Sequence, residues 1–199
     1  KGTLLDLGCG TGQIIIPLAQ HFQKAVAVDP EKEMLMYAKK RPQNLHSSNI
    51  IWIQKKAEQV LKNLPSVRLV TMGRSFHWMD QEKVLKMLYP IIEKGGGITI
   101  VSDTTSAWRE NEPIEWKKIR RQIVQKYLGL KRRAGTSFYT HSQKRYEDFF
   151  IPYKFTESKK YIYEYTNIWD IKSAVNFIFS TSFASPRFFG GRIQQFKKE

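Results

Sequence analysis

Short apolar runs alternate with helical stripes of apolar residues along the first half of the chain. The runs predict strands at residues 3–7, 25–29, 49–54, 67–72 and 98–103, each bounded by turn residues. Helices are expected after residue 12, from Pro30 to before Pro42, over residues 57–61, and from Asp80 as N-cap to the Gly95-Gly96-Gly97 stop. Such alternation favours an α/β fold: a doubly wound, mostly parallel sheet with helices on both faces.

The pattern changes after residue 103. Apolar spacing predicts a helix over residues 108–128, a late strand at 160–165, a helix at 171–179 and a helix start at 190–196. Residues 1–103 are therefore assigned to a ligand-binding core and residues 104–150 to a helical lid insertion. Residues 151–199 are expected to be the C-terminal part of the same domain.

The composition indicates one globular domain of 199 residues with a substantial core. No apolar run approaches the ~20 residues of a membrane span, so none is expected. Cys9 is the single cysteine, which excludes an internal disulfide and favours a reducing, cytoplasmic location. We interpret Cys9 as a small space-filling residue and not as a nucleophile, because no motif places a base beside it.

The positive charge is uneven along the chain. Of the formal net charge of +15, two thirds lies in residues 104–199, and the predicted helix there is rich in Lys and Arg. A basic surface can attract nucleic acid, an anionic membrane or an acidic small molecule. It can equally be a solvated face that keeps the protein soluble.

The glycine turn after the first strand is the main candidate for ligand binding. Gly8, Gly10 and Gly12 let the backbone turn tightly and come close to a ligand, and Asp29 follows the second strand. A dinucleotide and S-adenosylmethionine both carry a ribose whose hydroxyls suit such a carboxylate. The G-x-G-x-G spacing differs from the dinucleotide fingerprint, and Asp6 suits an ammonium group better than a diphosphate.

Four separated motifs then carry a resemblance to a known family. They are residues 5–12 (LDLGCGTG), 28–30 (VDP), 56–58 (KAE) and 75–80 (SFHWMD). In this order and spacing they resemble the class I S-adenosylmethionine-dependent methyltransferases, nearest to the small-molecule group that includes trans-aconitate methyltransferase-like proteins. The likeness covers residues 1–103 well and continues loosely to residues 180–186. Because a helix before the first strand and a final strand are missing, the chain is expected to be a fragment or to lack its ends.

The resemblance implies a Rossmann-like fold, S-adenosylmethionine as cofactor, and a role for each matching residue. Asp6 would orient the amino group, Asp29 would bind the ribose hydroxyls, and the glycine turn would pack against the methionine part. The implied cofactor-binding residues are Asp6, Gly8, Gly10, Gln13, Asp29, Pro30, Met34, Ala57, Glu58, Arg74 and Ser75. Phe76, His77 and Trp78 are implied to face the substrate.

Several of these residues have a plain structural alternative. Asp29 could cap the next helix, Glu58 could be a solvated helix residue, and Met34 could belong to the core. His77 could act as a general base or pack structurally against Trp78. No metal-ligand cluster is visible, because His21, His46, His77 and His141 are scattered.

The favoured interpretation is a methyltransferase that acts on a small molecule, with an acidic acceptor in view of the charge. An RNA methyltransferase that uses the basic face is the second possibility. Against it, the sequence shows no Asn-Pro-Pro-Tyr-type loop after the fourth strand and no separate RNA-binding module. A non-catalytic cofactor-binding or scaffold protein is the third. The acceptor, the methylated atom and the oligomeric state cannot be derived from these motifs.

Overall fold

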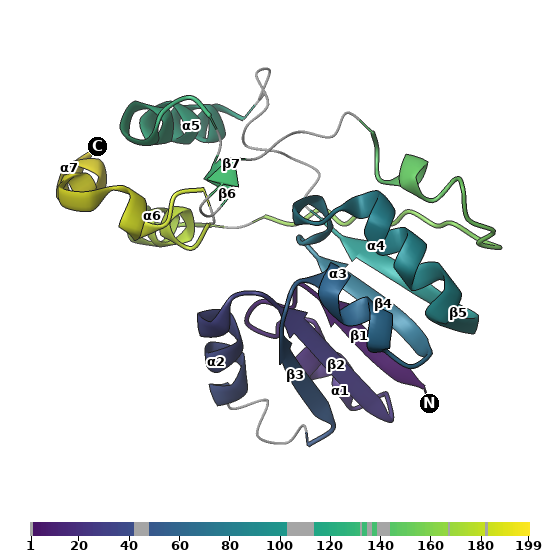
Figure 1. Cartoon of the computed structure of the whole chain (residues 1–199). Coiled ribbons are helices and arrows are strands. Elements are labelled where there is room, and N and C mark those ends of the chain that lie inside the picture. The colour runs from purple at the N-terminus through teal and green to yellow at the C-terminus, as the bar shows by residue number, and fades with distance from the viewer. Residues whose placement is uncertain are drawn as a thin grey trace. The chain divides into compact units, whose positions relative to one another are not determined.

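The chain forms two compact units (Figure 1). The computed structural model describes residues 2–41, 48–102, 114–131, 133–134, 137–138, 144–166, 168–181 and 183–199. Unit 1 consists of residues 1–103 and 144–155, and unit 2 of residues 104–143 and 156–199. Among the described residues, no helix is both long and apolar enough to cross a membrane.

Unit 1 is built on a five-stranded, entirely parallel sheet. Its strands are β1 (Thr3–Leu7), β2 (Lys24–Asp29), β3 (Ile50–Gln54), β4 (Val67–Gly73) and β5 (Ile92–Val101). They are ordered β3-β2-β1-β4-β5, so the sheet reverses its winding at β1. The parallel α/β prediction is confirmed, and the carboxyl ends of β1, β2 and β4 meet at one edge, where such sheets bind ligands.

Alternate residues of the central strands fill two separate cores. On one face, Leu5 and Val26 pack under the helices α3 (Ala57–Val60) and α4 (Gln81–Leu88). On the other face, Leu4 and Ala25 pack under the helices α1 (Ile15–Ala19) and α2 (Lys32–Lys40) (Figure 1). Burial on both faces explains why these strands are continuously apolar in the sequence.

The helices differ from the predicted ones mainly at their starts. The second helix begins at Lys32 and not at Pro30, because Glu31 still has an extended backbone. Leu35 and Ala38 are the buried residues of α2. Asp80 caps α4 as predicted, and its carboxylate accepts the Lys83 N–H at 3.1 Å.

The predicted stop at Gly95-Gly96-Gly97 is wrong. Helix α4 ends at Leu88, and a 3-10 turn over Tyr89–Ile91, with Pro90 inside it, leads into β5. The three glycines lie within β5, where the pairing with β4 shifts register between Val67 and Leu69. Gly95 has φ of +75°, which glycine adopts without strain, so the glycines form an irregular strand start and not a helix end.

Residues 144–155 pack within unit 1, although the sequence had placed residues 144–150 in the insertion. Phe149 is 7% exposed and belongs to the core that covers α4. The Phe76 ring meets the rings of Tyr146 and Phe149 edge to face, with centroids 5.4 and 5.9 Å apart. Burial of these aromatic rings thus holds residues 144–155 against the rest of unit 1. We call these twelve residues the strap.

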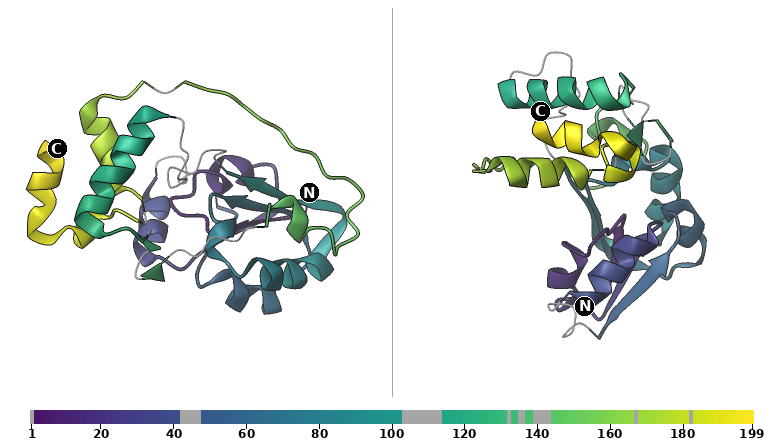
Figure 2. Two further views of the ribbon diagram at one scale, coloured as in Figure 1. Left: turned by 90° about the horizontal axis from the view of Figure 1, so that it is seen from above. Right: turned by 90° about the vertical axis from the view of Figure 1, so that its left-hand side faces the viewer.

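Unit 2 is a small helical assembly with its own core. Its elements are α5 (Glu115–Leu128), the two-residue strands β6 (Arg133–Ala134) and β7 (Ser137–Phe138), α6 (Ile171–Phe179) and α7 (Ile193–Lys198). The three helices lie side by side in both views of Figure 2. Val124, Phe189 and Phe196 are buried between them. Residues 108–113 of the predicted helix 108–128 lie outside the described residues.

The predicted late strand at residues 160–165 is not formed. Residues 157–166 have no regular secondary structure, and the side chains of Tyr161, Ile162, Tyr163 and Tyr165 are exposed. A strand requires a partner for its backbone N–H and C=O groups, and no described strand pairs with this segment. Alternating residues alone therefore did not suffice to predict a strand.

Candidate functional site

The glycine turn lies at the carboxyl edge of the sheet and is tied to β2 through its backbone. The N–H groups of Gly8 and Cys9 both donate to the carbonyl of Val28, at 2.8 and 3.0 Å. Gly8, Gly10 and Gly12 have φ of +69°, +53° and +77°, a region that other residues occupy only at a cost. These positive φ angles explain why glycine occupies the three positions, as predicted.

The three glycines differ in the space around them. A Cβ on Gly8 would lie 2.4 Å from Ser75 Cβ, and a Cβ on Gly12 would lie 2.7 Å from Ile16 Cδ1. A Cβ on Gly10 would meet nothing within 4 Å. Gly8 and Gly12 are thus required for packing, whereas Gly10 presents bare backbone to open space at the sheet edge.

Asp29 closes the turn from the end of β2. Its Oδ2 accepts the N–H of Gly10 at 2.8 Å, and its Oδ1 accepts the N–H of Glu31 at 2.9 Å. Glu31, and not Asp29, is the N-cap residue of α2, so the capping alternative does not describe Asp29. A carboxylate offers about four acceptor positions, so both oxygens retain capacity for a further donor.

Asp6 is the buried charge of the site. It is 1% exposed, and its Oδ1 accepts the hydroxyl of Thr71 at 2.7 Å. Its Oδ2 is buried without a hydrogen-bond partner in the described part of the chain. Burial, joined by the charge of Asp29, raises the pKa of Asp6 from 3.8 to about 6, against the opposing effects of Thr71 and the amide of Ile15. At neutral pH Asp6 is therefore mainly an anion with one unmatched oxygen.

Cys9 lies in the same turn, and its environment makes the thiol unreactive. It is 7% exposed, and burial raises the pKa of its thiol far above the ordinary value, with the charges of Asp6 and Asp29 adding to the shift. Since the thiolate is the reactive form, this cysteine is not an activated nucleophile. The interpretation of Cys9 as a space-filling residue agrees with this environment.

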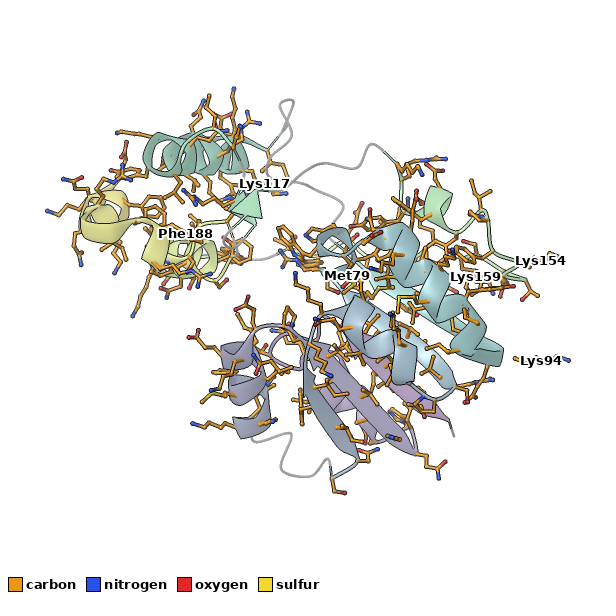
Figure 3. All side chains as sticks on the ribbon, in the orientation of Figure 1. Met79, Lys94, Lys117, Lys154, Lys159 and Phe188 are labelled. Carbon is orange, nitrogen blue, oxygen red and sulfur yellow. The ribbon has the colours of Figure 1, made fainter. Side chains whose placement is uncertain are left out.

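The loop after β4 approaches the turn from the other side. Arg74 has φ of +53°, which is rare for a residue with a Cβ, and its N–H donates to the carbonyl of Val101 at 2.7 Å. The buried hydroxyl of Ser75 donates to the carbonyl of Leu7 at 2.6 Å. The bond of Arg74 to β5 and the bond of Ser75 to β1 hold the loop against the glycine turn. Met79 lies at the same edge (Figure 3).

The three residues predicted to face the substrate separate in the structure. Phe76 is 1% exposed and lies in the core beneath the strap, so it does not face a ligand. The rings of His77 and Trp78 are in contact, with centroids 4.4 Å apart, and Trp78 is 40% exposed. The correction for Phe76 has a physical reason, because an aromatic residue beside Tyr146 and Phe149 gains more from burial than from exposure.

The remaining predicted residues lie on the surface around this edge or support it. Met34 is 41% exposed, so the alternative that placed it in the core is wrong. Pro30 and Gln13 are also exposed. Ala57 is buried, and the Oε1 of Glu58 accepts the N–H of Asp80 at 3.0 Å, which links α3 to the start of α4.

Two residues that the motifs did not indicate contribute to this site. Thr71 binds Asp6 from the neighbouring strand, where the two residues are register partners. Arg41, at the end of α2, donates to the carbonyl of Thr11 at 3.2 Å. A register assignment between β1 and β4 would have revealed Thr71, whereas nothing in the sequence around Arg41 indicates its contact. In the described residues, no three His, Cys, Asp or Glu side chains are grouped as metal ligands.

Comparison with known proteins supports an assignment for this arrangement. Residues 4–96 match the family model described as a methyltransferase domain. This part of the chain is therefore similar to methyltransferase domains. The matched range covers β1 to β4, the glycine turn and the start of β5, so the likeness coincides with the sheet of unit 1.

Individual relatives agree with the family match. The chain is 29% identical over 101 residues to a probable S-adenosylmethionine-dependent methyltransferase of Saccharomyces cerevisiae, covering 48% of this chain and 35% of that protein. It is 28% identical over 138 residues to an uncharacterized methyltransferase-like protein of Schizosaccharomyces pombe, covering 68% of this chain and 48% of that protein. The chain thus spans less than half of the length of each.

A solved structure supports the fold. The crystal structure of the YcgJ protein from Bacillus subtilis is similar to this chain with a TM-score of 0.54 and 20% identity, covering 76% of this chain and 61% of that one. At this level of identity the likeness concerns the fold alone. It agrees with the Rossmann-like, doubly wound arrangement of unit 1.

Proposed function

We propose that this protein transfers a methyl group from S-adenosylmethionine to a small-molecule acceptor. The observation that carries the proposal is the pair of carboxylates around Gly10: the unmatched Oδ2 of Asp6 and the part-occupied oxygens of Asp29. A ligand with an ammonium group and vicinal hydroxyls has the donors that these oxygens lack. The open space at Gly10 leaves room for such a ligand against the backbone.

Each end of the cofactor has a matching group in unit 1. The Asp6 carboxylate would take the amino group, and the Asp29 oxygens would take the ribose hydroxyls beyond their two backbone donors. Met34 and Pro30 are exposed near Asp29 in the sequence, and apolar side chains of this kind suit the faces of an adenine ring. Ala57 and Glu58 are proposed at the adenine edge, with Glu58 already held by the N–H of Asp80.

The reaction requires little chemistry from the protein. S-adenosylmethionine supplies an electrophilic methyl group, so the protein's main task is to align the acceptor with it, and orientation can contribute a large part of the rate. The backbone of Arg74 and Ser75 is proposed to lie near the sulfur. The exposed Trp78 and its neighbour His77 are proposed to line the acceptor side, where His77 would act as a base only for an acceptor that must lose a proton.

The nature of the acceptor is proposed from charge. Residues 104–199 hold two thirds of the net positive charge of the chain, which would attract an acidic small molecule. An ionised carboxylate acceptor also needs no general base.

Isothermal titration of the whole protein with S-adenosylmethionine tests the proposal. Binding is expected for the wild type, and Asp29→Ala should weaken it by at least about tenfold, because a buried charged acceptor is lost. Asp170→Ala is the matched control: Asp170 caps α6 in unit 2 through the Ser173 N–H, so it removes a similar carboxylate contact and should leave the affinity unchanged. No binding to the wild type would overturn the proposal.

A further inference from the structure

Thr71 makes a side-chain hydrogen bond to Asp6, the buried charge of the site. Asp6 on β1 and Thr71 on β4 are register partners in the parallel sheet, and the Thr71 hydroxyl donates to Asp6 Oδ1 at 2.7 Å. Both residues are at most 2% exposed, so water does not compete for this hydrogen bond. The two residues are 65 positions apart in the chain, and the contact exists only because β1 and β4 are neighbours.

The contact distinguishes the two oxygens of one carboxylate. Oδ1 is held by Thr71, whereas Oδ2 is buried and has no hydrogen-bond partner among the described residues. A buried anion with an unmatched oxygen is costly, because a buried polar atom loses its hydrogen bonds to water. The protein tolerates this cost at the turn where its cofactor is proposed to bind.

The groups that face Asp6 come from every element around it. Asp29 from the end of β2 and Cys9 from the glycine turn are the titratable groups that interact with it electrostatically. Thr71 from β4 and the amide of Ile15 from α1 are the dipoles that favour its ionised form. Asp29 disfavours that form, so the Thr71 hydroxyl opposes both burial and a like charge.

We propose that Thr71 is a positioning residue for cofactor binding: its hydroxyl holds Oδ1 of Asp6 so that Oδ2 presents an anionic acceptor to the amino group of S-adenosylmethionine. This inference rests on the proposed function. It assigns a role to a residue of β4 that does not itself touch the cofactor. Loss of the hydroxyl leaves Asp6 in place but makes its ionisation harder, so the effect on binding depends on pH.

Three variants separate this role from general packing. Thr71→Val removes the hydroxyl at nearly constant volume, and Thr71→Ser retains it. Thr99→Val makes the same change at the exposed register partner of Thr71 on β5. Should Thr71→Val fail to fold, Thr71→Ala removes the same donor with a smaller side chain and takes its place.

The first measurement uses the ligand-free protein and does not depend on methyltransferase activity. Carbon-detected NMR of the Asp6 carboxyl should give a titration midpoint near 6 for the wild type, Thr71→Ser and Thr99→Val. For Thr71→Val the midpoint should rise by about 1 pH unit, as expected when a carboxylate loses a hydrogen bond to its charged form. An unchanged midpoint in Thr71→Val, or an equal rise in Thr71→Ser, would overturn the inference.

The second measurement compares affinities for S-adenosylmethionine as a function of pH. With a shift of about 1 unit, Thr71→Val should bind about fivefold more weakly than the wild type at pH 6 and about twofold more weakly at pH 7. The ratio of the two affinities cancels the ligand's own titration. A ratio that is constant with pH would mean a structural effect and would refute the positioning role, whereas absence of binding to every form, wild type included, would refute the proposed function.

Discussion

Gly10 gives the sharpest test of where the ligand lies. Its φ is +53°, and a Cβ built on it would meet no atom within 4 Å. Gly10→Ala should therefore cost only the strain of a left-handed alanine, about 1–2 kcal/mol, without a steric clash inside the protein. This is a minor part of the ~5–15 kcal/mol that stabilises a typical domain, so the variant should fold.

Binding should respond quite differently to the same methyl group. The open space at Gly10 is where the proposed cofactor must approach the backbone between Asp6 and Asp29, so the added Cβ should occupy part of the ligand's volume. We expect the affinity for S-adenosylmethionine to fall by at least about tenfold, which corresponds to about 1.4 kcal/mol. Isothermal titration measures this loss, and urea denaturation measures the change in stability.

Gly190 provides a matched control in unit 2. It has the same φ of +53°, and a Cβ there would also meet nothing within 4 Å. Gly190→Ala should therefore show the same strain in its unfolding free energy and no change in affinity. The reasoning fails if Gly10→Ala binds as tightly as the wild type, or if both alanine variants lose affinity to the same extent.

Two further predictions concern stability. Because burial raises the pKa of Asp6 to about 6, the folded state favours its neutral form, and its contribution to the unfolding free energy should fall by about 2 kcal/mol as the pH rises from 4 to 7. Asp6→Asn should remove this dependence, so its stability relative to the wild type should improve over that range in urea denaturation; a constant difference would contradict the assigned cause. Phe149→Ala should lower the unfolding free energy of unit 1 by about 3–5 kcal/mol, since the ring is buried against Phe76. A loss below about 1 kcal/mol in the same measurement would show that the strap does not belong to the core.

The sequence by itself determined the parallel sheet, the glycine turn and the acids beside it. These features depend on local properties: runs of apolar residues buried on both faces, and positive φ angles that glycine adopts cheaply. Asp29 was predicted from its place after the second strand, and it lies next to Gly10. Residues that follow parallel strands meet at one edge whatever the details of packing.

Tertiary structure alone decided which of the predicted site residues are buried and which contacts they make. Phe76 adjoins His77 in the sequence, yet it is buried because Phe149, far along the chain, covers it. Glu58 is held by the N–H of Asp80, and Thr71 by its partner on β1. Residues 160–165 alternate like a strand but have no described partner strand. In each case the outcome depends on a contact distant in sequence, and local pattern contains no information about which distant segment fills the adjoining space.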